Sequence, residues 1–187
     1  MPVDQLPALE SQKFAVKLFI EAGHDIPLDD FVPVFHSWIQ QQSVADHLLI
    51  DVADYKHVAD GPGMVLVAHE ANIHIDETHG RRGLLYVRKQ PLGGGFAKRA
   101  GQIIGYALGL AHRLESEAAF AGRLKFDPSQ LMFRINDRLH VHNSAETFEQ
   151  LRPILIDAIG GALGSRQVTL SHTPDTQKLF EVIAQRP

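Results

Sequence analysis

Three apolar runs separated by turn sequences, all between residues 48 and 89, constrain the fold more than any other feature of this chain. The runs cover residues 48–55, 64 to about 76, and 83–89, and glycine or proline lies in both connections between them. Short alternating runs bounded by such residues are typical of β-strands joined by tight connections. We therefore expect an antiparallel meander in this part of the chain.

Other segments show strand alternation or helical periodicity. Residues 13–21 and 166–171 alternate as single strands, the first with one buried side, and residues 124–143 predict two short strands about a turn at Asn136 and Asp137. Helical spacing of apolar residues predicts four helices: 27–42, 91–118, a third that follows a cap at Asn143 or Ser144 and is kinked by Pro153, and 173–185.

This order of elements predicts an α+β fold with a single, largely antiparallel sheet and helices packed on one face. The regular strand and helix alternation that accompanies a parallel sheet is missing. No low-complexity linker or internal repeat divides the chain. We expect one globular domain over residues 1–187, with residues 1–12 as a loosely ordered N-terminal lead.

The composition argues against several classes of function. A net charge of -4, with no block of five or more lysines and arginines, argues against nucleic-acid binding. No apolar run approaches the roughly 18 residues that span a bilayer, and the first residues lack a secretion-signal pattern, so we expect a cytoplasmic protein without membrane contact. The absence of cysteine excludes disulfides, thiolate catalysis and cysteine-bound zinc. We expect no cofactor.

The run at 48–55 carries two carboxylates among apolar neighbours. Alternation places Asp51 on one face and Asp54 on the other, where burial raises a carboxylate pKa unless a cation or hydrogen-bond donors compensate. One interpretation is an acid–base cluster at the strand end, with Asp51, Asp54 and His57 as catalytic candidates. The alternative is structural: both carboxylates accept hydrogen bonds from backbone amides near the frayed end of the strand.

We expect a ligand pocket where the loop 60–63 meets the turn at 135–138. Its candidate binding residues are Tyr55, Asp60, Arg134, Asn136 and Arg138. One of the two arginines would bind an anionic group of a small ligand, or would pair with Asp51 or Asp54 and hold the two segments together. The sequence leaves open whether such a pocket is catalytic.

A glycine run at 93–95 opens the long helix. Backbone amides, the helix dipole and Lys98 or Arg99 suit an anion such as phosphate. The run matches neither the phosphate-loop pattern nor the GxGxxG pattern after a strand, so a flexible loop before a helix is the simpler interpretation.

Eleven histidines raise the question of a metal site. His140 and His142 share one strand face, and His74 and Asp76 share another with Glu70 and Asn72. Two ligands on one strand face are a start, but a closed site needs three or four ligands with supporting hydrogen bonds. His69 falls on the apolar face of its run, which predicts a hydrogen-bonded core histidine. We expect no bound metal.

Gly101, Gly105 and Gly109 line one side of the long helix at 97–117, opposite its apolar stripe. Each glycine inside a helix costs about 1 kcal/mol relative to alanine, so three of them suggest that something touches this face. Small residues four apart allow close approach of another helix of this chain, of a second copy, or of a flat ligand. A non-enzymatic homodimer or scaffold module that uses this face is the alternative to a ligand pocket.

Two segments carry a resemblance to other proteins. They are "LLIDVADYKHVADGPG" at 48–63 and "INDRLHVHNSAETFEQLRP" at 135–153. The chain resembles an uncharacterised bacterial protein family with IDVADY-x-HV-x-DGPG and INDRL blocks, and the likeness covers most of its length. No activity is assigned to that family, so the resemblance implies no catalytic residue. His140 and His142 stand where the family has apolar residues and a proline, which argues against a shared metal site.

Overall fold

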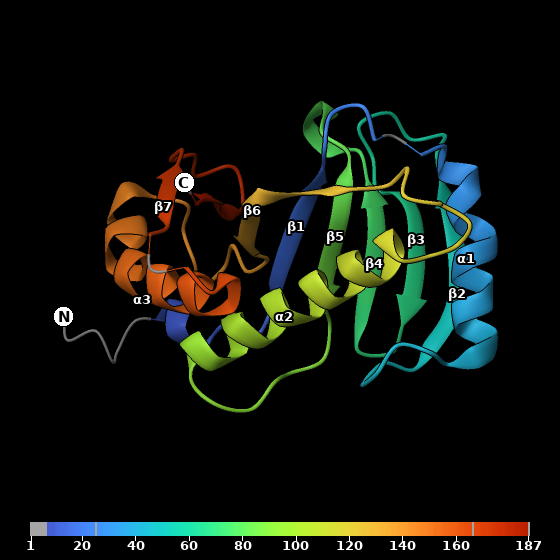
Figure 1. Cartoon of the computed structure of the whole chain (residues 1–187). Coiled ribbons are helices and arrows are strands. Elements are labelled where there is room, and N and C mark those ends of the chain that lie inside the picture. Colours follow the sequence, from blue (N-terminus) through green and yellow to red (C-terminus); the bar gives the residue numbers. More distant parts are fainter. Residues whose placement is uncertain (1–6, 25, 166, 187) are drawn as a thin grey trace. The chain divides into compact units, whose positions relative to one another are not determined.

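The computed structural model describes residues 7–24, 26–165 and 167–186. Its strands form one eight-stranded antiparallel sheet in the order β2-β3-β4-β5-β1-β6-β8-β7, and the described residues also form three α-helices (Figure 1). The predicted α+β fold with a single antiparallel sheet is confirmed. Contacts along the chain group into two compact units, each described by itself. This grouping does not test the prediction that residues 1–187 form one domain.

The meander unit comprises Lys17–Gln90 and Tyr106–Pro128. Four of its strands pair in chain order, as Figure 1 shows: β2 (Leu49–Tyr55), β3 (Gly63–Ala68), β4 (Ala71–Asp76) and β5 (Gly83–Arg88). The three pairings are antiparallel, with Leu66 opposite Ile73 and Ile73 opposite Tyr86. The predicted meander is confirmed, and β2 is an edge strand of the sheet.

The run predicted as one strand from Met64 to about Asp76 is two strands. β3 ends at Ala68 and β4 begins at Ala71, so only two residues connect them, which is enough for an antiparallel hairpin. The apolar pattern continues across this connection and hides the turn from the sequence. His69 lies in the turn and is exposed, so its prediction as a core histidine is wrong.

The first helix, α1 (Leu28–Gln41), lies against β2 and β3 (Figure 1). Its predicted apolar stripe is buried, at Phe31, Val34, Phe35 and Trp38. The Trp38 indole Nε1 donates to the Glu117 carboxylate at 2.6 Å, which ties α1 to the segment that follows α2 (Phe96–Glu115). The helix is therefore fixed by apolar burial together with one polar contact.

The first strand, β1 (Phe14–Ile20), is buried on both sides, whereas the sequence predicts burial on one side only. Lys17 explains the difference. Its Nζ lies 2.5 Å from the Asp76 carboxylate, and both side chains are almost fully buried. The ion pair allows a charged residue to occupy the second buried face.

The terminal unit comprises Met1–Val16, Pro91–Gly105 and Ser129–Pro187. Its elements include the short 3-10 helix η2 (Pro7–Glu10), most of β6 (Phe126–Ile135), α3 (Ala145–Leu163), β7 (Thr169–His172) and β8 (Phe180–Gln185). In its core, the Phe14 ring centroid lies 5.2 Å from that of Phe96 and 5.4 Å from that of Phe133. Both β6 and β7 pair antiparallel with β8.

The predicted N-terminal lead is described only from residue 7 on. Residues 7–10 form η2, and Ala8 and Ser11 are buried, while residues 1–6 lie outside the described residues. That residues 1–12 are loosely ordered stays a prediction. None of the helices in the described ranges is long and apolar enough to cross a membrane.

Two predicted elements of the terminal unit are wrong. The predicted hairpin at 124–143 is one strand, β6, which lies between β1 and β8 in the sheet. His140 and His142 therefore lie in a loop and share no strand face. The predicted helix at 173–185 is a loop followed by β8. Residues 180–185 alternate between buried and more exposed side chains, which is the period of a strand.

Two other predictions for this unit, a strand near residues 166–171 and a cap at the start of α3, are confirmed. The strand predicted at 166–171 corresponds to β7. Ser144 is the residue that caps α3, because its Oγ accepts the Thr147 amide at 3.1 Å. Pro153 lies inside α3, which continues to Leu163.

Candidate functional site

Asp51 and Asp54 are exposed on the edge strand β2, so their predicted burial among apolar side chains is wrong. Asp51 Oδ1 accepts the Val52 amide at 2.8 Å, and Asp54 Oδ1 accepts the Lys56 amide at 2.9 Å. The hydrogen bond from the Lys56 amide is the main cause that lowers the pKa of Asp54. These bonds agree with the structural interpretation, in which both carboxylates accept hydrogen bonds from backbone amides near the end of the strand.

The other candidates beside β2 are exposed as well. Tyr55 stacks on His57 with ring centroids 6.3 Å apart, and Asp60 Oδ1 accepts the His79 amide at 2.5 Å. Among the described residues, none of the three catalytic candidates hydrogen-bonds to another of the three. The structure therefore gives the predicted acid–base cluster no internal proton path.

The predicted arginine partners belong to the terminal unit and have partners there. Arg134 donates to the Glu181 carboxylate through Nε at 2.9 Å and Nη2 at 2.7 Å, and Arg138 Nη1 donates to the Gln177 carbonyl at 2.8 Å. Their predicted pairing with Asp51 or Asp54 would join the two units and stays a prediction. The backbone N–H of Asn136 donates to the Lys13 carbonyl at 2.6 Å. A pocket shared by loop 60–63 and turn 135–138 would need residues of both units, and it stays a prediction.

The histidines do not gather around one point. His140 Nδ1 lies 3.0 Å from Asp137 Oδ1 in the loop after β6. On β4, both ring nitrogens of His74 are buried and have no hydrogen-bond partner among the described residues, and burial lowers the pKa of His74 to about 4. Within the described parts of the chain, no group of three or more histidine, aspartate or glutamate side chains is placed to hold a metal ion.

The glycine face of α2 is open. A Cβ added at Gly101, Gly105 or Gly109 would meet no atom within 4 Å, as far as the described residues reach. Packing of this face against another helix of the same chain, one of the three predicted interpretations, is therefore not seen among the described residues. Contact with a second copy or with a flat ligand stays a prediction.

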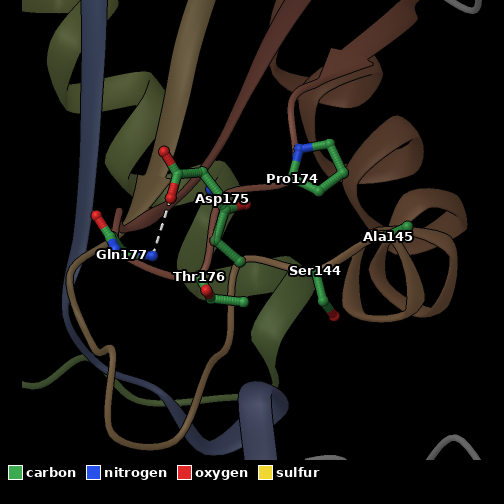
Figure 2. A pocket seen from close by; sticks show the side chains of 7 residues that line it. Ser144, Ala145, Pro174, Asp175, Thr176 and Gln177 are labelled. Atoms are coloured by element: carbon green, nitrogen blue, oxygen red, sulfur yellow. Dashed lines mark hydrogen bonds between the residues drawn. The ribbon is translucent and has the colours of Figure 1, made fainter.

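One pocket, of about 440 Å³, opens at the start of α3 and is lined by residues 143–145 and 174–177 (Figure 2). Several of its polar groups are bonded to neighbouring amides: the Ser144 hydroxyl accepts the cap bond described above, and Asp175 Oδ1 accepts the Gln177 amide at 2.9 Å, the dashed line of Figure 2. The Asp175 carboxylate also opposes binding of an anion near the helix start. This pocket offers a ligand few free charged groups.

A second pocket, of about 470 Å³, opens where α2 begins. It is lined by residues 94–99 together with Leu9, Glu10 and Ile154, all of which belong to the terminal unit. The sequence singles out the glycine run and Lys98 or Arg99 as an anion site, but it gives no reason to bring Leu9, Glu10 or Ile154 to the same place.

Arg99 is the buried cation of this pocket, with only 5% of its surface exposed. Its Nη1 donates to the Gly94 carbonyl, and its Nη2 donates to the carbonyls of Leu9 at 2.5 Å and Ser11 at 3.2 Å. Its Nε is buried and has no acceptor in the described part of the chain. Among the described residues no carboxylate pairs with it. Because neutral carbonyls leave the buried positive charge uncompensated, an anion beside the guanidinium would be stabilised.

The start of α2 adds further donors. The Arg99 amide donates to the Gly95 carbonyl at 3.1 Å, which makes Gly95 the N-cap residue, and glycine has no side chain that accepts the next amides. The amides of residues 96–98 have no partner in the described chain, and they lie at the positive end of the helix dipole. Gly94 has φ +96°, which glycine adopts without strain, and its carbonyl accepts Arg99.

The charges that line this pocket are of both signs. Lys98 and Arg99 are cationic, and Glu10 is anionic and exposed. A Cβ on Gly94 would lie 2.7 Å from the Lys98 side chain, so the bare glycine leaves room for the lysine stem. The positive charges and the free amides outweigh the single carboxylate at this site.

In comparisons with known proteins, no family model, no curated protein and no solved structure matches this chain. The resemblance to an uncharacterised bacterial family stays a prediction. Only the geometry and the charge of the site at the start of α2 therefore support a function for it.

Proposed function

We propose that this protein binds a small anionic ligand in the pocket at the start of α2. The observation that carries the proposal is Arg99, a buried guanidinium with an unpaired Nε and no carboxylate partner among the described residues, on the wall of a pocket of about 470 Å³. The ligand class is the one expected from the sequence. Its location differs from the expected one, since the supporting residues surround the glycine run at 93–95.

An anion in this pocket would lie beside the Arg99 guanidinium and would accept hydrogen bonds from the amides of residues 96–98. The Arg99 Nε is buried, so a small shift of this side chain would be needed for it to donate as well. Charge-assisted bonds of this kind are stronger than neutral ones, and helix N-termini bind phosphate, sulfate and carboxylate groups. No hydroxyl or imidazole group is among the described lining residues, so reversible binding is the simplest function. We place this function in the cytoplasm, without a nucleic-acid or membrane partner, as the composition predicts.

The test is a titration with inorganic phosphate followed by NMR of the backbone amides. We expect the amides of residues 96–98 to shift together and to saturate. Arg99→Gln should weaken phosphate binding about tenfold or more, because it removes charge-assisted bonds worth about 1.5 to 3 kcal/mol. Lys98→Gln, at an exposed cation, should weaken it about two- to fivefold.

Lys125→Gln is the matched control, because Lys125 is exposed and does not line the pocket. It removes the same charge and should leave the phosphate affinity unchanged. Circular dichroism shows whether the Arg99 variant is folded, and the wild-type shift pattern decides the question if it is not. Phosphate-induced shifts that leave the amides of residues 96–98 unchanged would rule out the proposed pocket.

A second candidate function is homodimer formation through the glycine face of α2. It is favoured by the open space at Gly101, Gly105 and Gly109. No contact in the described chain compensates the free-energy cost of three glycines inside a helix. We expect sedimentation velocity to show a dimer that Gly105→Leu dissociates. A monomeric wild-type protein at high micromolar concentration would eliminate this candidate.

A further inference from the structure

We propose further that the ligand of the α2 pocket is a small zwitterion, with its anionic group at Arg99 and an ammonium group at Glu10. This inference rests on the proposed function and specifies the chemistry of the ligand. It starts from the one carboxylate among the residues that line the pocket.

The same guanidinium that would bind the anion also fixes the position of Glu10. Arg99 Nη2 donates to the carbonyls of Leu9 and Ser11, the residues on either side of Glu10. The backbone of Glu10 is therefore held beside the guanidinium, at the end of η2, and its side chain lines the pocket. A carboxylate is thus built into the wall of an anion site.

The Glu10 carboxylate is available to a ligand. Within the described residues it forms no ion pair and accepts no hydrogen bond, and in particular Lys98 does not pair with it. A purely anionic ligand would be repelled by this charge. A ligand that also carries an ammonium group turns the same charge into an attraction, so the pocket discriminates between the two.

The size and lining of the pocket limit how far apart the two charges of the ligand are. Both protein charges line a single pocket of about 470 Å³, so a chain of a few atoms suffices to join them. The side chains of Leu9, Ala97 and Ile154 in the same lining are apolar and suit a short carbon chain. The class that fits is a phosphate or carboxylate joined to a primary ammonium, such as a phosphorylated amine or an amino acid.

The experiment compares two probes of equal size by calorimetry at neutral pH. Phosphoethanolamine carries an ammonium group where propyl phosphate carries a methyl group. We expect the wild-type protein to prefer phosphoethanolamine about three- to fivefold, the range of an exposed ion pair. Glu10→Gln should abolish this preference by weakening phosphoethanolamine and tightening propyl phosphate.

Glu146→Gln is the matched control, because Glu146 is exposed in the first turn of α3 and lies outside this pocket. It lowers the negative charge of the protein equally and should leave the ratio of the two affinities unchanged. A Glu10→Gln variant that tightens both probes alike, or changes neither, overturns the zwitterion. The anion pocket survives that result if Arg99→Gln weakens both probes. If neither probe shifts the amides of residues 96–98, the proposed function fails and this inference fails with it.

Discussion

The loops 60–63 and 93–95 are both rich in glycine, yet they use it in opposite ways. In the first loop, Gly63 has φ +61°, and a Cβ there would overlap the Ile75 carbonyl oxygen. In the second loop, a Cβ on the first or last glycine would meet nothing within 4 Å among the described residues. In the first loop, close packing requires glycine. In the second loop, the glycines leave the backbone without side chains to cover it.

This difference separates two explanations that look alike in sequence. A glycine without room for a Cβ is explained by the fold around it. A glycine in open space is not explained by intrachain packing. Loop 93–95 leads to helix amides that have no partner among the described residues and that lie beside a buried guanidinium. Loop 60–63 is thus a structural connection between β2 and β3, and the candidate site lies at loop 93–95.

Gly63→Val should give the largest effect that tests this comparison. A branched side chain is strained at positive φ and would also collide with the Ile75 carbonyl, so we expect the free energy of unfolding to fall by about 3 kcal/mol or more. Denaturant melts followed by circular dichroism measure this loss. An unchanged midpoint would show that loop 60–63 is not closed around its glycine.

Sequence patterns predict an element correctly when the length of its apolar run and the period of that run indicate the same structure. The long helix is an example, because its predicted apolar stripe is buried from Phe96 to Leu114. Prediction from the sequence fails where one apolar pattern runs through two elements. The unbroken apolar run across His69 gives no sign of the turn between β3 and β4. Prediction from the sequence also fails at 173–185, where Thr173 and Pro174 indicate a helix start but Phe180, Val182 and Ala184 alternate as a strand.

The sequence predicts only part of the candidate site, because some of its residues are adjacent along the chain and others are far apart. The glycine run, Lys98 and Arg99 are adjacent along the chain, so local reasoning finds them. The burial of Arg99 depends on carbonyls of Leu9 and Ser11, which lie 90 and 88 residues away along the chain. Pro7 suits the first position of a helical turn, and that is the one local signal for η2. The exposure of Asp51 and Asp54 likewise follows from strand order, which no local pattern encodes.

Acid should weaken the strand that closes loop 60–63. His74 precedes Ile75 on β4, and burial lowers its pKa from 6.5 to about 4. The unfolded state therefore binds a proton first as pH falls, so stability should decline between pH 6.5 and 4, by about 3 kcal/mol at most. His74→Leu should remove this part of the pH dependence, which urea melts at several pH values measure. A variant with the same acid slope as the wild type would assign the slope to other groups.

Gly93→Ala should have a small effect on stability, in contrast to Gly63→Val. The added Cβ meets open space, so we expect a change within about 0.5 kcal/mol, with a slight gain because alanine restricts the unfolded chain. The same denaturant melts compare the two variants directly. A loss as large as that of the Gly63 variant would show that loop 93–95 is closed by packing too, and the contrast between the loops would disappear.

Asp54→Asn should have the smallest effect, with no measurable change in the unfolding midpoint. Had Asp54 been buried, its loss would leave a partner unsatisfied, but the side chain is exposed and the asparagine carbonyl still accepts the Lys56 amide. Because the folded state lowers the pKa of Asp54, any stability from its charge is present above pH 3.8 and lost in stronger acid. Melts of both proteins at neutral pH and below pH 3 test this. A midpoint that differs at neutral pH and coincides in acid would mean that charge on β2, in addition to the packing of Gly63, holds loop 60–63 in place.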